Sequence, residues 1–321
     1  MVERLAAFIP PARTIGAVTQ RAQVAESLGY ESVWVIQVAE RDATIVAAAI
    51  AGATTKIGIG TGILPTYPRT PAVMAQTAAT LDELSGGRFT LGLGPSHRVT
   101  IEMWHGMELS KPVESIREYV GAIRAIFAGQ PFSGDIYRTA FSFMGYKLER
   151  ANIPIYLSCL SPRMCRLAGE VADGAVLWMC SPEYISSTVV PNIAKGRAKA
   201  GKAMDGFEIV AAVPLSMTQD RSAGMDSFRK VATVYWNLPF YRKAVEGAGF
   251  GDSLAKFDAG GPQAIPDETI EALAGIGDAE ACRTTINSYR DSGVTLPALS
   301  QLPRHDGSVE WTEAMDLLKP V

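Results

Sequence analysis

KIGIGTGILPTYPRTP, from Lys56 to Pro71, is the stretch that decides the fold. Its first half alternates β-branched residues with glycines at Gly58, Gly60 and Gly62. A period of two predicts a strand, here one with no side chains on one of its faces. Because glycine weakens a strand, three of them indicate a bulge, or the close approach of another backbone or a ligand.

The second half of this stretch ends the strand and starts a helix. Pro65, Pro68 and Pro71 stop the strand and stiffen a short loop. Apolar residues then recur at helical spacing from Val73 to Leu84. In a parallel α/β fold, ligands bind at the carboxyl ends of the strands. We therefore expect this proline-rich loop to lie at a ligand site.

The same strand–helix unit recurs along the chain. Eight strand-like runs are expected, at Arg4–Ile9, Glu31–Ile36, Ile57–Ile63, Arg88–Gly94, Pro154–Cys159, Gly174–Met179, Phe207–Thr218 and Thr295–Ser300. Helical patterns follow them, including Pro182–Lys202 and a closing helix at Val309–Leu318. Eight strands that are each followed by a helix predict an α/β protein of the (β/α)8 TIM-barrel class rather than a doubly wound sheet. We expect residues 1–321 to form this barrel as a single domain.

Some connections are longer than a barrel needs. Pro95–Ser110 is expected to be a long loop, and the excursion after the fourth helix to hold a β-hairpin around Tyr137–Leu148. The largest insertion, about residues 221–293, separates the seventh strand from the eighth and contains several helices. Its glycine-rich part near Gly247–Pro266 is expected to be a mobile loop.

Composition limits the classes of function. A chain of 321 residues with 47% hydrophobic content can bury the core of one large barrel. A net charge of −3 and a pI near 5.8 argue against a nucleic-acid partner. The longest nearly apolar run, Ala43–Ala53, is far shorter than the roughly 18 residues of a membrane span. Since the first residues also lack the pattern of a signal peptide, we expect a cytoplasmic protein without a membrane partner.

The cysteines and histidines do not form a metal-binding motif. No CxxC spacing occurs among the four cysteines, which are Cys159, Cys165, Cys180 and Cys282. They are interpreted as buried free thiols in a reducing compartment. His105 and His305 have no partners at the spacing of metal ligands, so we expect no metal site.

Candidate ligand-binding residues follow the fourth strand. Gly92-Leu93-Gly94 is not a dinucleotide-binding fingerprint, because a third glycine and a suitably placed acidic residue are missing. Its glycines fit close packing of strands in a barrel instead. Ser96 and His97 leave the strand at its ligand-binding end. From its position alone, His97 is either a ligand contact or an ordinary loop residue.

A second candidate site follows the fifth strand. Ser161-Pro162-Arg163 begins a helix, with serine as the N-cap and proline at the first helical position. The free N–H groups and the dipole of a helix start also attract phosphate, and Arg163 and Arg166 add positive charge. Both interpretations stay open, since a capping hydroxyl can also face a phosphate.

The second strand is followed by several polar residues. Asp42 is the expected N-cap of the next helix, and Gln37 is expected to point most nearly into the barrel mouth. The chain shows no Ser-His-Asp, Cys-His or paired-carboxylate set and no phosphate-binding P-loop. A pocket without such groups indicates that a cofactor carries the chemistry.

Several segments together resemble the bacterial-luciferase-like flavin and deazaflavin oxidoreductases. They are the opening stretch, the run LDELSGGR from Leu81 to Arg88 with the following LGLGPSH, and Leu157–Gly174. The resemblance covers the chain from Arg4 to about Ser300. The segments PTYPR, GPSH and SPRMCRLAGEVADGAVLWM are most similar to the branch that uses the deazaflavin coenzyme F420.

The resemblance implies a cofactor site at the barrel mouth. The Gly62–Ile63 bond would be a cis peptide within a bulge that backs the cofactor ring, with the loop Leu64–Arg69 lining the pocket. Phosphate contacts would come from Leu160, Ser161, Pro162 and Arg163. The ring or its substrate would be lined by Gln37, Ser96, His97, Trp178 and Met179.

The resemblance also implies a reaction. Coenzyme F420 would exchange a hydride between its deazaflavin C5 and a carbon of a small organic substrate. The candidate catalytic residues are His97, as a hydrogen-bond partner or proton donor, and Gln37, which cannot act as a general acid. Two alternatives remain, an FMN-dependent monooxygenase on the same barrel and a catalytically silent flavin-binding barrel. A homodimer is expected.

Overall fold

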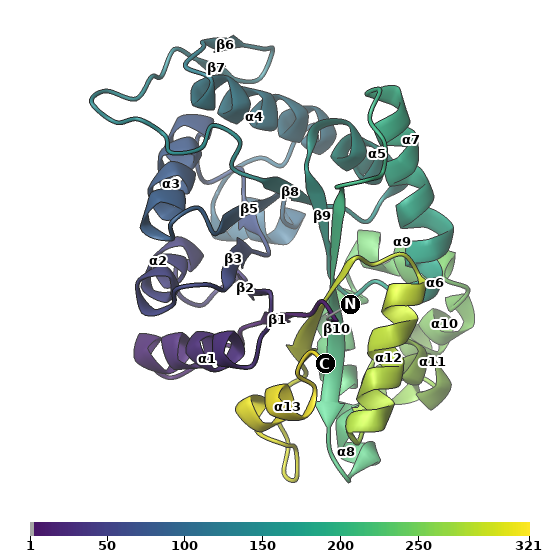
Figure 1. The fold of residues 1–321 in the computed structure, drawn as a ribbon. Coiled ribbons are helices and arrows are strands. Elements are labelled where there is room, and N and C mark those ends of the chain that lie inside the picture. The colour runs from purple at the N-terminus through teal and green to yellow at the C-terminus, as the bar shows by residue number, and fades with distance from the viewer. Residues whose placement is uncertain (1–2) are drawn as a thin grey trace.

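The computed structural model describes residues 3–321 and contains a closed barrel of eight parallel strands (Figure 1). In order around the barrel these are β1 (Ala6–Phe8), β2 (Ser32–Val35), β3 (Gly58–Thr61), β5 (Phe89–Gly94), β8 (Ile155–Ser158), β9 (Gly174–Leu177), β10 (Glu208–Met217) and β12 (Leu296–Gln301). The barrel closes because β10 pairs with both β9 and β12, and β12 pairs with β1. The predicted TIM barrel is confirmed.

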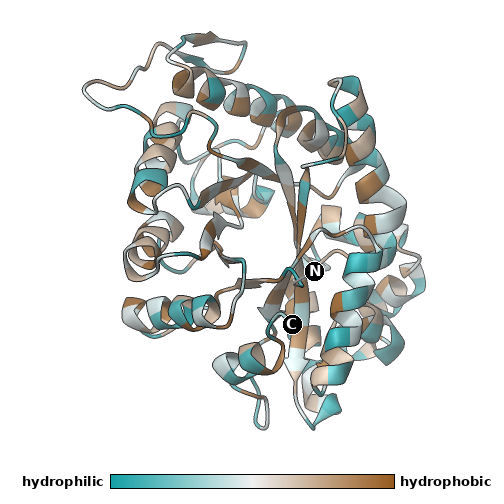
Figure 2. Cartoon of the chain, in the orientation of Figure 1, coloured by the Kyte–Doolittle hydropathy of each residue, from teal (hydrophilic) through white to brown (hydrophobic). Residues whose placement is uncertain are grey.

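Helices surround this barrel on its outside (Figure 1). They are α1 (Ile15–Ser27), α2 (Ala43–Ala53), α3 (Pro71–Leu84), α4 (Pro112–Phe127), α5 (Pro162–Val171), α7 (Val190–Lys199), α12 (Ala279–Asp291) and α13 (Trp311–Leu317). Figure 2 shows hydrophobic residues along the strands and mixed hydropathy along the helices, as expected for helices that cover a barrel. None of the helices within residues 3–321 combines the length and the apolar character needed to cross a membrane.

Two predicted segments contain π-helical turns. The expected loop Pro95–Ser110 includes η1 (Val99–Trp104), so it is not wholly irregular. The expected helix Pro182–Lys202 is divided into α6 (Pro182–Tyr184), η2 (Ile185–Val189) and α7. Pro191 in the first turn of α7 has no N–H to donate, which favours a widened turn just before it.

The hairpin prediction was wrong in position. The structure pairs β6 (Phe132–Ser133) with β7 (Arg138–Thr139), so the first strand lies before the expected range of 137–148 and the second at its start. The turn is held by Glu118 of α4, whose carboxylate accepts the backbone N–H groups of Asp135, Ile136 and Tyr137 at 3.1, 2.8 and 3.0 Å. The position of the hairpin therefore depends on a residue outside it.

The largest insertion lies between β10 and β12, as predicted. Before α12 it comprises α8 (Arg221–Tyr235), α9 (Pro239–Gly247), α10 (Gly251–Gly260), the short 3₁₀ helix η3 (Pro262–Ala264), α11 (Asp267–Leu273) and β11 (Gly275–Gly277). The expected loop near 247–266 is mostly helical instead. Its glycines Gly249 and Gly261 have φ values of 90° and 73° and mark the ends of helices. Leu254 and Phe257 of α10 are buried in a second hydrophobic cluster.

The short strand β11 was not predicted, and it extends the barrel wall. Leu215 of β10 pairs with Gln301 of β12 on one side and with Gly275 of β11 on the other. Since β9 pairs with the start of β10 on the same side as β11, β11 takes over where β9 ends. The insertion is thereby attached to the barrel at its carboxyl end.

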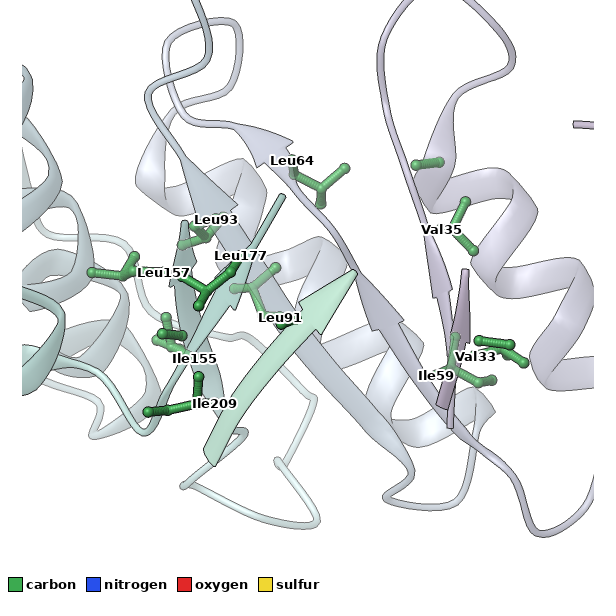
Figure 3. Packing of buried hydrophobic residues seen from close by; sticks show 14 of the residues in the cluster. Val33, Val35, Ile59, Leu64, Leu91, Leu93, Ile155, Leu157, Leu177 and Ile209 are labelled. Atoms are coloured by element: carbon green, nitrogen blue, oxygen red, sulfur yellow. The ribbon is translucent and has the colours of Figure 1, made fainter. Parts of the chain in front are cut away.

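Aromatic and aliphatic side chains together fill the barrel interior. The ring of Trp34 stacks on Tyr156 at a centroid distance of 5.8 Å, and Phe8 meets Trp178 edge-to-face at 5.7 Å. Alternate residues of the same strands, such as Val33 and Ile155, belong to the larger core between barrel and helices (Figure 3). This alternation is the period of two that was predicted for the strands.

The strand glycines make room for these neighbours. A Cβ atom on Gly60 would lie 2.4 Å from Cε3 of Trp34, and one on Gly92 would lie 1.7 Å from the carbonyl oxygen of Thr61. Gly60 is therefore explained by a side chain inside the barrel, and Gly92 by the backbone of the adjacent strand. The close-packing interpretation of Gly92 is confirmed.

We predict that Gly92→Ala destabilises the protein by about 3 kcal/mol or more, because the carbonyl of Thr61 cannot move without breaking the sheet. Gly52→Ala is the matched control, since nothing lies within 4 Å of its added methyl group and alanine favours a helix. That variant should gain about 0.5 kcal/mol. Urea unfolding of both variants measures these changes, and equal stability of the two would contradict the packing account.

Candidate active site

The amino-terminal end of the barrel is closed by an ionic network. Arg4 donates from Nε to Glu31 and from Nη2 to Glu208, each at 2.6 Å. The hydrogen bond to Glu31 is the main reason why the pKa of Arg4 is raised. With this end closed and the interior filled by side chains, a ligand can approach the barrel only at its carboxyl end, which we call the mouth.

At the mouth, the third strand contains a bulge. Gly60 pairs with Thr90 and Leu64 pairs with Leu93. Between these two pairs the third strand advances by four residues and β5 by three, so the third strand holds one extra residue. The extra residue falls at Gly62–Ile63, where the peptide bond is cis as predicted, and β4 (Leu64–Pro65) resumes the pairing. Gly62 and Ile63 are half-buried between buried neighbours, and since Gly62 has no side chain, the bulge exposes backbone at Gly62.

The loop after β4 lines a cavity, but not the one expected. Tyr67 and Arg69 border a cavity of about 480 Å³ together with Met107, Lys111 and Tyr137. None of the predicted site residues lines this cavity. It lies towards the hairpin side of α4, apart from the residues that converge at the mouth.

The fourth barrel strand ends in a strained turn that carries His97. Ser96 has a φ of 62°, a left-handed conformation that costs a non-glycine residue on the order of 1–3 kcal/mol. The ring of His97 lies 5.7 Å from that of Tyr241 and 6.5 Å from that of Tyr235, between centroids. Burial lowers the pKa of His97 below its ordinary value of 6.5 and so favours the neutral imidazole.

The end of β9 has a similar turn. Met179 has a φ of 48° and is buried. Beside it, the ring of Trp178 lies 5.9 Å from that of Tyr235. The indole N–H of Trp178 is buried and has no hydrogen-bond partner among residues 3–321, although the Tyr235 phenol is close enough for the indole to affect its pKa. Such an orphaned donor needs a ligand or a water molecule.

The start of α5 has the geometry of an anion site. Ser161 caps the helix by accepting the N–H of Met164 at 3.2 Å, and Pro162 occupies the first turn. The N–H of Arg163 in this first turn has no acceptor within the helix. The side chain of Arg163 pairs with Glu114, and that of Arg166 donates to Asn192 at 2.7 Å. Backbone groups, rather than free arginine side chains, are therefore what this helix start offers to a phosphate.

Gln37 has a structural contact of its own. Its Oε1 accepts the N–H of Ala43 at 3.2 Å, while Asp42 accepts the N–H of Thr44 at 2.8 Å. Both side chains thus cap α2, and the N-cap prediction for Asp42 is confirmed. Gln37 is half-buried at the top of β2, and its catalytic role stays a prediction.

Three tyrosines near the mouth were missed by the sequence analysis. Tyr235 and Tyr241 come from α8 and α9 of the insertion. Tyr184 donates from its hydroxyl to the carbonyl of Leu160 at 2.9 Å, and its ring fills the space beside Gly247 of α9. It therefore links the insertion to the turn before α5. For Tyr235 and Tyr241, the sequence did contain a signal of a possible site, the aromatic-rich run YWNLPFY from Tyr235 to Tyr241.

The four cysteines are buried and free, as predicted. Burial raises the pKa of the Cys180 thiol well above its ordinary value, so this thiol is a poor nucleophile. Within residues 3–321, no group of three or more His, Cys, Asp or Glu side chains is arranged to hold a metal ion.

We predict that His97 titrates below 6.5 in the folded protein, because burial disfavours the imidazolium. The proton NMR signals of its imidazole, assigned by their loss in His97→Gln, measure this pKa. Since the unfolded chain binds the proton more readily, His97 adds stability above pH 6.5 that is lost as the pH falls towards its folded-state pKa. A measured value at or above 6.5 would contradict the desolvated environment.

Comparison with known proteins agrees with this geometry. Residues 3–296 match the family model of luciferase-like monooxygenases. A 5,10-methylenetetrahydromethanopterin reductase of Methanolobus tindarius is 29% identical over 89% of this chain and 90% of its own length. A putative coenzyme F420-dependent oxidoreductase of Mycobacterium tuberculosis is 28% identical over 85% of this chain and 87% of its own length.

The fold is also that of a solved structure. The coenzyme F420-dependent tetrahydromethanopterin reductase of Methanopyrus kandleri superposes with a TM-score of 0.84 at 23% identity, over 98% of this chain and 97% of the other. This likeness concerns the fold alone. The family model, however, spans most of the sequence. The chain belongs to the luciferase-like monooxygenase family.

Proposed function

We propose that the protein is a coenzyme F420-dependent oxidoreductase that moves a hydride between the deazaflavin C5 and a carbon of a small organic substrate. The observation that carries the proposal is that the Gly62–Ile63 bulge, the start of α5 and the strained turns at Ser96 and Met179 all follow barrel strands at one end. The names of the relatives support F420 as the cofactor, since two of the proteins compared above use it or are thought to.

The residues present fit a flat ring with a phosphate-bearing side chain. Gly62 exposes backbone at the mouth, which suits contact with a planar face. The unpaired N–H groups at the start of α5 suit a phosphate, and Leu160 is held in place there by Tyr184. When bound, F420 would supply the hydride chemistry, for which the chain itself has no redox group.

The chain's own part is to bind, orient and exclude water. The rings of Trp178, Tyr235 and Tyr241 pack over the mouth and reduce its contact with solvent. Burial favours the neutral form of His97, which can donate one hydrogen bond and accept another. We therefore propose that His97 orients the reacting groups by hydrogen bonding rather than acting as an imidazolium acid.

Two expectations from the sequence are independent of this reaction. The homodimer and the cytoplasmic location stay predictions, and no step of the proposed reaction requires either of them. The FMN-dependent alternative uses the same mouth and is separated from the proposal by cofactor affinity.

We predict that the purified protein binds F420 and not FMN, and that Ser161→Asp weakens F420 binding at least tenfold by repelling its phosphate, a loss of about 1.4 kcal/mol. Aspartate caps a helix as well as serine does, so thermal stability should not change. Quenching of tryptophan fluorescence measures both affinities.

Thr14→Asp is the matched control, since it places the same charge at the N-cap of α1. It should leave F420 binding unaltered. Unchanged affinity in Ser161→Asp would place the phosphate elsewhere, and binding of FMN in preference to F420 would favour the monooxygenase alternative.

A further inference from the structure

The insertion brings two tyrosines to the mouth from outside the barrel. Tyr235 ends α8 and Tyr241 lies in the first turns of α9, with ring centroids 4.9 Å apart. They meet His97 from the end of β5 and Trp178 from the end of β9. We call these four residues the aromatic roof. Its members come from four separate elements, so their meeting is a property of the folded chain.

The two tyrosines are held firmly by the second hydrophobic cluster. Trp236, next to Tyr235, is buried and packs edge-to-face on Phe257 of α10 at 5.6 Å. Arg242, next to Tyr241, makes two hydrogen bonds to the carboxylate of Asp258, at 2.9 and 2.6 Å. The positions of the rings in the roof are thus fixed by α10, independently of any ligand.

The polar atoms of the roof have no partners within the described chain. Only 6% of the surface of Tyr241 is exposed, yet its hydroxyl makes no hydrogen bond to another of the residues 3–321. The hydroxyl of Tyr235 and the imidazole of His97 are partly exposed, and the Tyr235 hydroxyl is close enough to the Trp178 indole for the indole to lower its pKa. Within residues 3–321, the indole N–H of Trp178 is the one polar atom of the roof that is both fully buried and unpaired. Because buried polar groups are normally paired, the Trp178 indole N–H calls for a ligand or a water molecule, and the polar atoms of Tyr235, Tyr241 and His97 lie beside it.

Among residues 3–321, no positive charge contributes to the pKa shifts of His97, Tyr235 and Tyr241. Burial alone lowers the pKa of His97, and burial is the main cause of the raised pKa values of Tyr235 and Tyr241. The one formal charge that acts on Tyr235 from the described residues is the negative charge of Glu40. An anionic group here would be desolvated without a counter-charge, which is costly.

We propose that Tyr235 and Tyr241 determine substrate specificity by hydrogen-bonding an uncharged carbonyl or hydroxyl oxygen of the substrate beside His97 and Trp178. The roof offers phenol, imidazole and indole donors to such an oxygen and apolar ring faces to the carbon skeleton. Uncharged substrates are thereby selected over anionic ones. The inference rests on the proposed function only in placing the substrate at the mouth.

The test compares acetophenone, an uncharged carbonyl compound, with benzoate, an anion of similar size. Saturation-transfer difference NMR titrations measure the binding of each probe to the wild-type protein, with and without F420. Tyr235→Phe and Tyr241→Phe remove one oxygen atom each. Tyr146→Phe is the control, because it also removes one phenol oxygen, but from a tyrosine outside the roof whose hydroxyl donates to the carbonyl of Ala79.

We expect acetophenone to bind at least tenfold more tightly than benzoate. Each of the two roof variants should weaken acetophenone binding about fivefold, the usual effect of one lost neutral hydrogen bond. Tyr146→Phe should change it less than twofold. Preference for benzoate, or acetophenone affinity within twofold of wild type in both roof variants, would overturn the inference.

The titrations with F420 distinguish a failure of this inference from a failure of the proposed function. If F420 binds but the roof variants have no effect, the inference fails while the proposed function stands. If F420 does not bind but the fivefold losses persist, the roof is a ligand site and the proposed cofactor is wrong.

Discussion

The packing of Trp34 against the glycine face of β3 is the contact on which the site depends. Because Gly60 has no side chain, the indole can lie inside the barrel, where it stacks on Tyr156. Phe8 and Trp178 continue this filling towards the mouth. The interior is therefore a packed core rather than a channel, as in other barrels of this class. All binding must take place at one end of it.

That end is built from features that cost free energy. Ser96 and Met179 hold left-handed backbone conformations, and the indole N–H of Trp178 is buried without a partner among residues 3–321. A fold tolerates such features when the surrounding structure over-determines them, and they cluster at functional sites. Here the surrounding structure is the second hydrophobic cluster of the insertion, which packs against Met179 and Trp178. The insertion therefore forms part of the mouth.

Local signals in the sequence predicted most of the fold and part of the site. The alternation in Ile57–Ile63, the N-caps Asp42 and Ser161 and the break at Gly62–Ile63 depend on residues close in sequence or on family resemblance, and the structure agrees with them. The hairpin was misplaced because Glu118, on another element, fixes its turn. The strand β11, with only three residues, is too short to show a period.

His97 and Trp178 were predicted as site residues, but their meeting with Tyr235 and Tyr241 was not, for the same physical reason. Tyr235 and Tyr241 are unremarkable members of two helices until the insertion folds back onto His97. The glycines near Gly261 look like a loop in the sequence because their role at helix ends depends on Leu254 and Phe257 being buried. Long-range packing, rather than local propensity, decides these parts of the molecule.

A crystal structure of the complex with coenzyme F420 tests the central claim most directly. The account predicts that the deazaflavin ring lies at the mouth against Gly62 and Ile63, with its phosphate at the N–H groups that begin α5. A ring bound instead in the cavity beside Tyr67 and Lys111, or a phosphate bound away from Ser161, would contradict it.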